Sequence, residues 1–345
     1  MESEKMNVCQ NESLVDRQKD LTTSDYYFDS YSHFGIHEEM LKDEVRTLSY
    51  RKAILNNRHL FQGKVVLDVG CGTGILCMFA AQAGAKLVIG VDNSEILPIA
   101  QKIIKANNFE NKIVLIKGKM EEVQLPVEKV DIIISEWMGY FMLYEGMLDT
   151  VLFARDKYLV PGGIIMPDRA SLHITAIEDS DYKQDKIEYW NNVYGFDMSC
   201  IREIALAEPL VDVVQAKMIA TTDCSILNID IHTIKKEELP FRSDFKLKAM
   251  RDDCVHAFVV YFDIEFTKGH KTVFFSTGPR AQYTHWKQSI LYLDDVLKLR
   301  QGEQITGSID VAPYQANQRD LKIKLSYDFK GSESQSSANI EYHMR

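Results

Sequence analysis

The pattern of apolar and polar positions divides the chain into three parts. Residues 1–24 are polar and aperiodic, which predicts a mobile N-terminal tail. From residue 25 to about 166, short apolar runs alternate with amphipathic stretches, as in chains that alternate strands and helices. From residue 167 to 345, apolar runs are separated mainly by turn residues, which is typical of a β domain.

The elements of the first half follow from the spacing of its apolar residues. Residues 37–55 carry apolar side chains at helical intervals. We expect buried strands at 65–69, 86–91, 113–116 and 130–134, with helices at 75–84 and 94–107. Strands that alternate with helices form an open parallel sheet with right-handed crossovers, so an α/β fold is expected here.

The second half shows fewer clear elements. Strands are expected at 171–177, 257–266 and 321–329, without regular helices between them. Residues 189–198, YWNNVYGFDM, are aromatic and irregular. Two interpretations stay open for this segment: a loop packed in the core, or an arm that contacts another protein.

Composition narrows the function classes. The 345 residues are 46% hydrophobic and carry a net charge of −10, from 50 acidic and 40 basic side chains. This argues against a general nucleic-acid binder and favours a basic substrate or partner. The six cysteines form no CxxC pair, so a zinc site has little support, and their scatter fits reduced thiols of the cytosol or nucleus. No apolar run reaches the roughly 18 residues of a membrane helix.

Two glutamates, Glu136 and Glu145, stand within an apolar stretch. Charged side chains are rarely buried without a partner, and two like charges repel unless a cation lies between them. Their odd spacing separates them on a straight helix or strand, so they converge only if the segment bends, which Gly139 and Gly146 would allow. We interpret them as a carboxylate clamp for a cation or as two surface charges. If they form a clamp, the segment is a hairpin that turns at Gly139 and Tyr140.

A glycine turn, residues 70–74, follows the first expected strand and opens a helix. Such a turn lets a ligand approach the main chain, and a dinucleotide, S-adenosylmethionine or no ligand at all are the alternatives. Asp68 favours S-adenosylmethionine, because a carboxylate repels a pyrophosphate and attracts the cationic methionine end. Asp92 could hold ribose hydroxyls, and Glu121 could accept from an adenine amino group.

Several motifs, taken together, resemble the protein arginine N-methyltransferases, most closely the type I members that make asymmetric dimethylarginine. The resemblance extends over about residues 25–345. It rests on YYFDSY at 26–31, VLDVGCGTG at 66–74, SEWMGY at 135–140 with Tyr144 and Glu145, and YTHW at 283–286.

The resemblance implies a Rossmann-like class I methyltransferase domain, then a β-barrel-like domain with a helical dimerisation arm at about 181–210. It implies methyl transfer from S-adenosyl-L-methionine, leaving S-adenosyl-L-homocysteine, to arginines of Arg-Gly-rich proteins and histone tails. A homodimer or higher oligomer in nucleus and cytoplasm is expected, with no metal, membrane or direct nucleic-acid binding.

The resemblance also assigns roles to single residues. Glu136 and Glu145 would grip the arginine, and His285 would pair with Asp43. The substrate pocket would include Tyr31, Met147 and Trp286, with Met40 and Met147 admitting a second methylation. Cofactor contacts are expected from His37, Met40, Arg46, Asp68, Gly70, Gly72, Asp92, Met120 and Glu121, with Arg46 paired to the cofactor's carboxylate.

Three features depart from the family pattern: Asp92 where Glu is usual, Gly146 where close relatives have Ser, and the segment 141–143. The last two bear on substrate preference. Two competing functions remain: a methyltransferase for small molecules or nucleic acid, and a scaffold without turnover. The first tends to show an Asn/Asp-Pro-Pro-Tyr motif where this chain has Ser135-Glu136-Trp137-Met138, and the second would be expected to lack clamp or cofactor residues.

Overall fold

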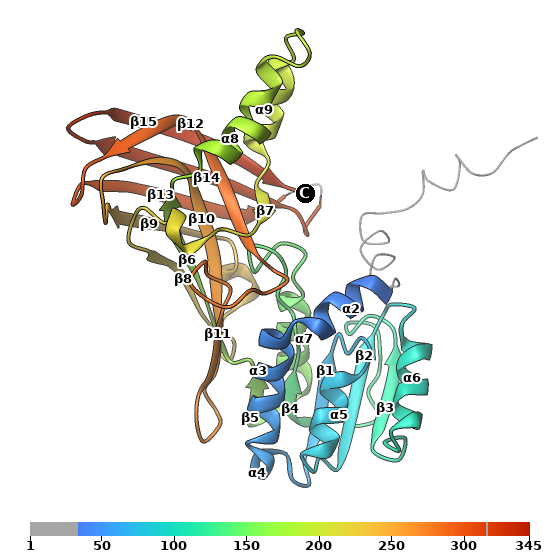
Figure 1. Cartoon of the computed structure of the whole chain (residues 1–345). Helices are drawn as coiled ribbons and strands as arrows, with labels where there is room; N and C mark the ends of the chain where they lie inside the picture. Colours follow the sequence, from blue (N-terminus) through green and yellow to red (C-terminus); the bar gives the residue numbers. More distant parts are fainter. Residues whose placement is uncertain (1–33, 315–316) are drawn as a thin grey trace, which may run out of the picture.

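The computed structural model describes residues 34–314 and 317–345. The expected tail, residues 1–24, and the motif that contains Tyr31 lie outside the described residues. An α/β half and a β half lie side by side, with one helical arm projecting from the β half (Figure 1).

The α/β half contains a five-stranded parallel sheet in the order β3-β2-β1-β4-β5. Its strands are β1 (Val65–Val69), β2 (Leu87–Asp92), β3 (Ile113–Lys117), β4 (Val130–Ile134) and β5 (Leu159–Met166). The helices are α5 (Ile75–Gln82), α6 (Leu97–Ala106) and α7 (Leu148–Tyr158). The expected parallel sheet is confirmed, and α7 and β5 are additional elements.

Three helices precede the sheet: α2 (Phe34–Lys42), α3 (Glu44–Leu55) and α4 (Arg58–Phe61). The single helix expected over 37–55 is therefore wrong at one point, Asp43. There the main chain is extended (φ −68°, ψ 95°), and the Asp43 side chain accepts a 2.9 Å hydrogen bond from the Arg46 amide. This N-cap starts a new helix, since a carboxylate satisfies an amide that the first helical turn leaves without a partner.

The β half is built from two antiparallel sheets. The first has the order β7-β12-β10-β6-β8 with β11 beside β10, and the second has the order β15-β14-β13-β9. Phe258 of the first sheet lies 5.5 Å from Phe245 and 5.9 Å from Tyr327 of the second, measured between ring centres, so the sheets share one core. The strands are β6 (Arg169–Ile177), β7 (Leu210–Asp212), β8 (Cys224–Asp230), β9 (Phe241–Lys248), β10 (Asp253–Phe266), β11 (Val273–Ser276), β12 (Gln288–Leu299), β13 (Gln304–Pro313), β14 (Leu321–Lys330) and β15 (Gln335–Met344).

The projecting arm contains α8 (Ser180–Lys186), the 3-10 helix η1 (Glu188–Asn191) and α9 (Ser199–Ala207) (Figure 1). The expectation that this half lacks regular helices is wrong here. Tyr194 is 94% exposed and Phe196 is 68% exposed, so the interpretation of 189–198 as a core loop is also wrong. Aromatic side chains exposed on a projecting arm are typical of a protein contact.

The two halves are joined along α3. Tyr50 packs edge-on against Phe266 at 4.9 Å between ring centres, and its hydroxyl donates a 2.8 Å hydrogen bond to the Ser135 carbonyl. The β10–β11 hairpin reaches the turn between α3 and α4, where Asn57 Oδ1 accepts from the His270 amide at 2.7 Å. Within the described part of the chain, no helix is long and apolar enough to cross a membrane.

Candidate active site

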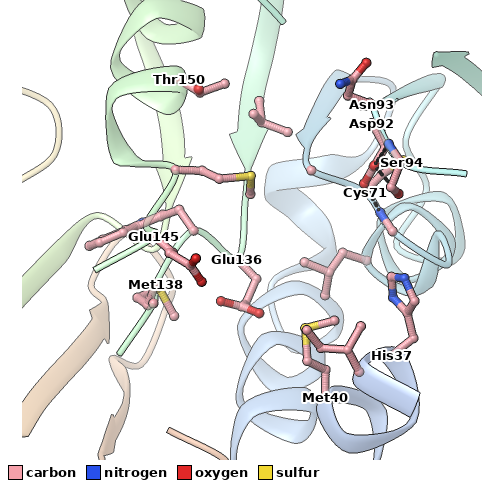
Figure 2. A pocket seen from close by; sticks show the side chains of 18 of the residues that line it. His37, Met40, Cys71, Asp92, Asn93, Ser94, Glu136, Met138, Glu145 and Thr150 are labelled. Carbon is pink, nitrogen blue, oxygen red and sulfur yellow. Dashed lines mark hydrogen bonds between the residues drawn. The ribbon is translucent and has the colours of Figure 1, made fainter. Parts of the chain in front are cut away.

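A cavity of about 460 Å³ lies where the carboxyl ends of the parallel strands meet the β half. Ligands of open α/β sheets bind at this end of the strands. Figure 2 shows side chains from several elements pointing into it. Most of the predicted site residues line the cavity: His37, Met40, Arg46, Gly70, Gly72, Asp92, Met120, Glu121, Glu136, Glu145, Met147, His285 and Trp286.

The glycine turn forms one wall. Gly70 and Gly72 have φ values of +74° and +51°, which residues with a Cβ rarely adopt. A Cβ on Gly70 would stand 2.4 Å from Met147 Cε, and one on Gly72 would stand 3.4 Å from His37 Cε1. The turn is therefore packed directly beneath two side chains of the predicted pocket.

Asp92, at the end of β2, is fixed by three hydrogen bonds. Its Oδ2 accepts from the Gly72 amide at 2.8 Å, and its Oδ1 accepts from the Ser94 amide at 2.8 Å and the Ser94 hydroxyl at 2.6 Å (Figure 2). The carboxylate is thus tied to the glycine turn and its position is set before any ligand binds.

Asp68 does not line the cavity, unlike the other acids predicted to hold the cofactor. It is fully buried; its Oδ2 accepts from the Cys77 thiol at 3.0 Å, and its Oδ1 has no hydrogen-bond partner in the described residues. Burial raises the pKa of Asp68 from 3.8 to about 7. Asp68 thus lies behind the wall of the cavity, and its role toward the methionine end of the cofactor stays a prediction.

Glu121 and Met120 follow β3. Glu121 Oε1 accepts a 2.9 Å hydrogen bond from the Thr150 hydroxyl at the start of α7, while Met120 is 2% exposed. Together they could bind a nucleobase: the carboxylate would accept from an amino group on the edge of the ring, and the apolar side chain would pack against its face. Thr150 was not predicted from the sequence.

The segment after β4 is the expected hairpin, with its turn one residue later than expected. The Gly139 amide donates to the Met142 carbonyl at 3.0 Å, so the turn lies at Tyr140 and Phe141. The positive φ values fall at Phe141 (53°), Met142 (63°) and Glu145 (52°), whereas the two glycines were expected to provide the bend. Gly139 serves close approach instead, because a Cβ there would stand 1.7 Å from the Tyr144 carbonyl oxygen.

This hairpin brings the two glutamates to one cavity. Their side chains come from opposite ends of the segment and point toward the same space (Figure 2). The divergent residues of the hairpin lie elsewhere: Phe141 and Met142 are 2% and 0% exposed, and neither these nor Gly146 lines the cavity. These departures therefore affect the scaffold of the clamp and not its lining.

Glu136 is held by Arg46. Arg46 Nε lies 2.8 Å from Glu136 Oε2, while the second oxygen, Oε1, is buried without a hydrogen-bond partner in the described residues. A buried carboxylate oxygen without a partner costs free energy unless a donor reaches it. The Glu136 side chain thus has one oxygen fixed and one available to a ligand.

Glu145 is positioned by the β half. Its amide donates a 3.1 Å hydrogen bond to the Arg319 carbonyl, from the loop between β13 and β14. Burial raises the pKa of Glu145, and the nearby Arg319 guanidinium partly offsets this. Arg319 also lines the cavity and was missed in the sequence, since only the fold brings it there.

His285 and Asp43 join the halves at the edge of the cavity. Asp43 Oδ2 lies 2.7 Å from His285 Nδ1 and accepts from the His285 amide at 2.9 Å, so the predicted pair is present. Burial would raise the pKa of Asp43, but hydrogen bonds from His285 and the Arg46 amide lower it below its usual range. The next residue, Trp286, is 3% exposed and donates from Nε1 to the Met138 carbonyl at 3.1 Å.

Comparisons with known proteins agree with this architecture. Residues 66–163 match a model described as a methyltransferase domain, and residues 168–333 match the arginine methyltransferase oligomerization subdomain. Protein arginine N-methyltransferase 1 of Dictyostelium discoideum is 76% identical over 335 residues, covering 97% of this chain and 98% of that protein. The protein of the same name from Chlamydomonas reinhardtii is 57% identical over 328 residues, and the match covers 95% of each chain.

The chain belongs to the protein arginine N-methyltransferase family. A solved relative, the Trypanosoma brucei PRMT1 enzyme–prozyme heterotetrameric complex with AdoHcy, has a TM-score of 0.90 and 49% identity, covering 92% of this chain and all of that one. The resemblance and the fold class inferred from the sequence are both confirmed.

The residues of the cavity fit the cofactor that arginine methyltransferases use. Asp92 and Glu121 present carboxylates for hydroxyl and amino groups, and the glycine turn brings the main chain itself to the wall of the cavity. Arg46 supplies a cation beside the turn. In the structure it is paired with Glu136 and was predicted to bind the cofactor's carboxylate; its five donors allow both contacts.

Proposed function

We propose that this chain is a type I protein arginine N-methyltransferase. It transfers methyl groups from S-adenosyl-L-methionine to guanidino nitrogens of protein arginines, giving monomethylarginine and asymmetric dimethylarginine. The observation that carries the proposal is the convergence of Glu136 and Glu145 on the cavity that the glycine turn lines. S-adenosylmethionine, when bound, supplies the electrophilic methyl group.

The clamp addresses a chemical difficulty of arginine. A guanidinium is always protonated near neutral pH, and its lone pairs are delocalised. Glu136, oriented by Arg46, offers its second oxygen to one edge of the guanidinium. Glu145 offers a second carboxylate. The two charge-assisted contacts fix the plane of the guanidinium and draw its positive charge away from the nitrogen that attacks the methyl group. Much of the rate enhancement then comes from placement.

A proton must leave after each transfer, because the product nitrogen becomes acidic. Glu145 is one acceptor, and its raised pKa makes it a better base than an ordinary glutamate. The second is His285. Since the pKa of Asp43 is lowered, its carboxylate is ionised and accepts from His285 Nδ1, which leaves Nε2 free to accept a proton.

The proposed substrates are basic segments, Arg-Gly-rich proteins and histone tails. The net charge of −10 supports this, because long-range attraction speeds the encounter of an acidic enzyme with a basic chain. Met40 and Met147 both line the cavity, and their flexible side chains are proposed to make room for a methylated nitrogen at the second transfer.

A homodimer or larger assembly is the proposed state, built through the arm of α8, η1 and α9. The match to an oligomerization subdomain and the exposed Tyr194 and Phe196 support it. The nucleus and cytoplasm are the proposed compartments; the unpaired thiols among the described residues fit reducing surroundings. Light scattering and a fluorescent fusion, respectively, test these two points.

The first experiment is label transfer from S-adenosylmethionine to an Arg-Gly-Gly repeat peptide and to its lysine-substituted twin. Label on the arginine peptide alone is expected, and chromatography should resolve monomethyl and asymmetric dimethyl products. Label on neither peptide would favour a scaffold, equal label on both would reject arginine selectivity, and symmetric dimethylarginine would reject the type I assignment.

A further inference from the structure

Each of four strands of the parallel sheet is preceded immediately by a lysine. Lys64, Lys86, Lys112 and Lys129 stand immediately before β1, β2, β3 and β4. These strands are parallel and neighbours in the order β3-β2-β1-β4, so the lysines lie along one edge, spaced by about 4.8 Å per strand. The amino edge of the sheet is opposite to the carboxyl edge, where the cavity lies.

Two further segments extend this edge, and neither contains an acidic residue. Residues 51–64, which cover the end of α3 and all of α4, include no Asp or Glu, and the same holds for residues 266–272 at the tip of the β10–β11 hairpin. At the mean acidic content of the chain, about three acids would be expected in these two stretches. The fold brings them together, because the tip of the β10–β11 hairpin contacts Asn57 beside α4 (Figure 1).

Most of the cations gathered here have no counter-charge. Lys64 pairs with Asp131 at 3.1 Å, Lys129 donates to the Lys157 carbonyl at 2.9 Å, and Lys268 lies 3.8 Å from Asp168. The remaining six are exposed and form no ion pair within the described part of the chain. We call these six the basic edge: Arg51, Lys52, Arg58, Lys86, Lys112 and Lys271.

We propose that the basic edge is a docking surface for an acidic segment of a partner protein. Unpaired like charges repel one another, and an anionic partner relieves that repulsion while gaining from each contact. The surface is confined: the lysine row spans about 14 Å, the length of four or five extended residues. A short run of Asp and Glu therefore fits within it.

A protein partner fits better than nucleic acid. A nucleic acid continues beyond the lysine row and would meet the rest of a chain whose net charge is −10. The location also fits a docking role. Because the basic edge lies at the opposite end of the strands from the cavity, a partner bound there leaves the cavity open to the arginine substrate.

The test measures binding of a fluorescent peptide with a run of five Asp and Glu residues to the full chain by anisotropy at low salt. One variant combines Arg58→Glu, Lys86→Glu and Lys112→Glu. The matched control combines Arg242→Glu, Lys246→Glu and Lys248→Glu, three exposed cations on β9 in the β half. The two variants have the same net charge. A single-stranded oligonucleotide of equal charge serves as the competing ligand.

The basic-edge variant should lose at least about tenfold in affinity for the acidic peptide, and the β9 variant less than about twofold, with methylation of a short Arg-Gly-Gly peptide equal in both. Equal losses of affinity in the two variants would show that only net charge matters and would overturn the proposal. So would absence of binding at low salt, or tighter binding of the oligonucleotide. If the triple variant unfolds, Lys86→Gln and Lys112→Gln should each give a partial loss, and no loss in either overturns the proposal.

Discussion

Arg46 and Glu136 form an ion pair of 2.8 Å in which the side chains are only 8% and 7% exposed. The pair joins α3 to the hairpin after β4, two segments that lie on either side of the glycine turn in the sequence. A buried carboxylate with one fixed oxygen and one unpartnered oxygen is oriented for a guanidinium before the substrate arrives. The cofactor wall and the substrate clamp are therefore parts of one connected arrangement.

Replacing Glu136 with glutamine tests this arrangement. The amide oxygen of the variant can still accept from Arg46, but the charge that attracts the guanidinium is lost. We expect kcat to fall by roughly two decades or more, the scale of a lost transition-state contact, while cofactor affinity measured by calorimetry changes little. Glu110→Gln, at an exposed site outside the cavity, is the control. A near-normal kcat for Glu136→Gln would contradict the clamp.

Glu145→Gln should leave cofactor binding intact and lower turnover by roughly two decades, the scale of a positioned acid–base group. The wild-type pH profile provides a second measurement. The group acts as a carboxylate, so activity is lost when falling pH protonates it; because burial raises its pKa, the acid limb of kcat/KM should lie above 4.5, the ordinary glutamate value. An identical acid limb in the residual activity of Glu145→Gln would assign that limb to another group.

The hairpin itself was largely predictable from the sequence, because two acids at an odd spacing in an apolar stretch converge only when the chain bends. The glycine turn, Asp92 and the four strands that feed the cavity followed from local pattern in the same way. What local pattern could not provide is contact across the domain boundary. The Trp286–Met138 hydrogen bond and the Arg319 carbonyl that holds Glu145 join residues more than a hundred positions apart.

The β half was harder to predict for a related reason. Strands such as β9 and β15 present one face to solvent, so half of their residues are polar and their apolar pattern is weak. Asp68 shows a different limit. Its position in the motif was informative, but whether a carboxylate reaches a ligand or faces a neighbouring thiol depends on packing that the sequence does not display.

The two hairpin glycines should respond differently to alanine. In Gly139→Ala the new Cβ would stand 1.7 Å from the Tyr144 carbonyl oxygen, so the hairpin must shift. In Gly146→Ala the nearest atom is 3.2 Å away, a tight but tolerable contact. We expect Gly139→Ala to lower the free energy of unfolding by about 1–3 kcal/mol and to lose most turnover, while Gly146→Ala stays active. Thermal midpoints and kcat of the pair, measured together, check this; equal behaviour would contradict the close-approach argument.

Asp68 predicts a pH-dependent stability of the cofactor-free protein. Its pKa is raised by burial from 3.8 to about 7, so the folded chain binds this proton more tightly than the unfolded chain. Stability from this group is therefore complete below pH 4 and falls as pH rises toward 7, by up to about 1.4 kcal/mol per pH unit. Asp68→Asn is neutral at every pH and should not show this loss.

The measurement is chemical denaturation of wild type and Asp68→Asn at several values between pH 5 and pH 8. Other groups titrate equally in both proteins, so the difference in free energy of unfolding isolates Asp68; it should move in favour of the variant as pH rises and become constant above about pH 7. Parallel curves would show that Asp68 does not titrate in this range. If Asp68 acts through space on a bound cation, S-adenosylmethionine should reduce the difference in free energy of unfolding between variant and wild type more than S-adenosylhomocysteine does. Only S-adenosylmethionine is a sulfonium.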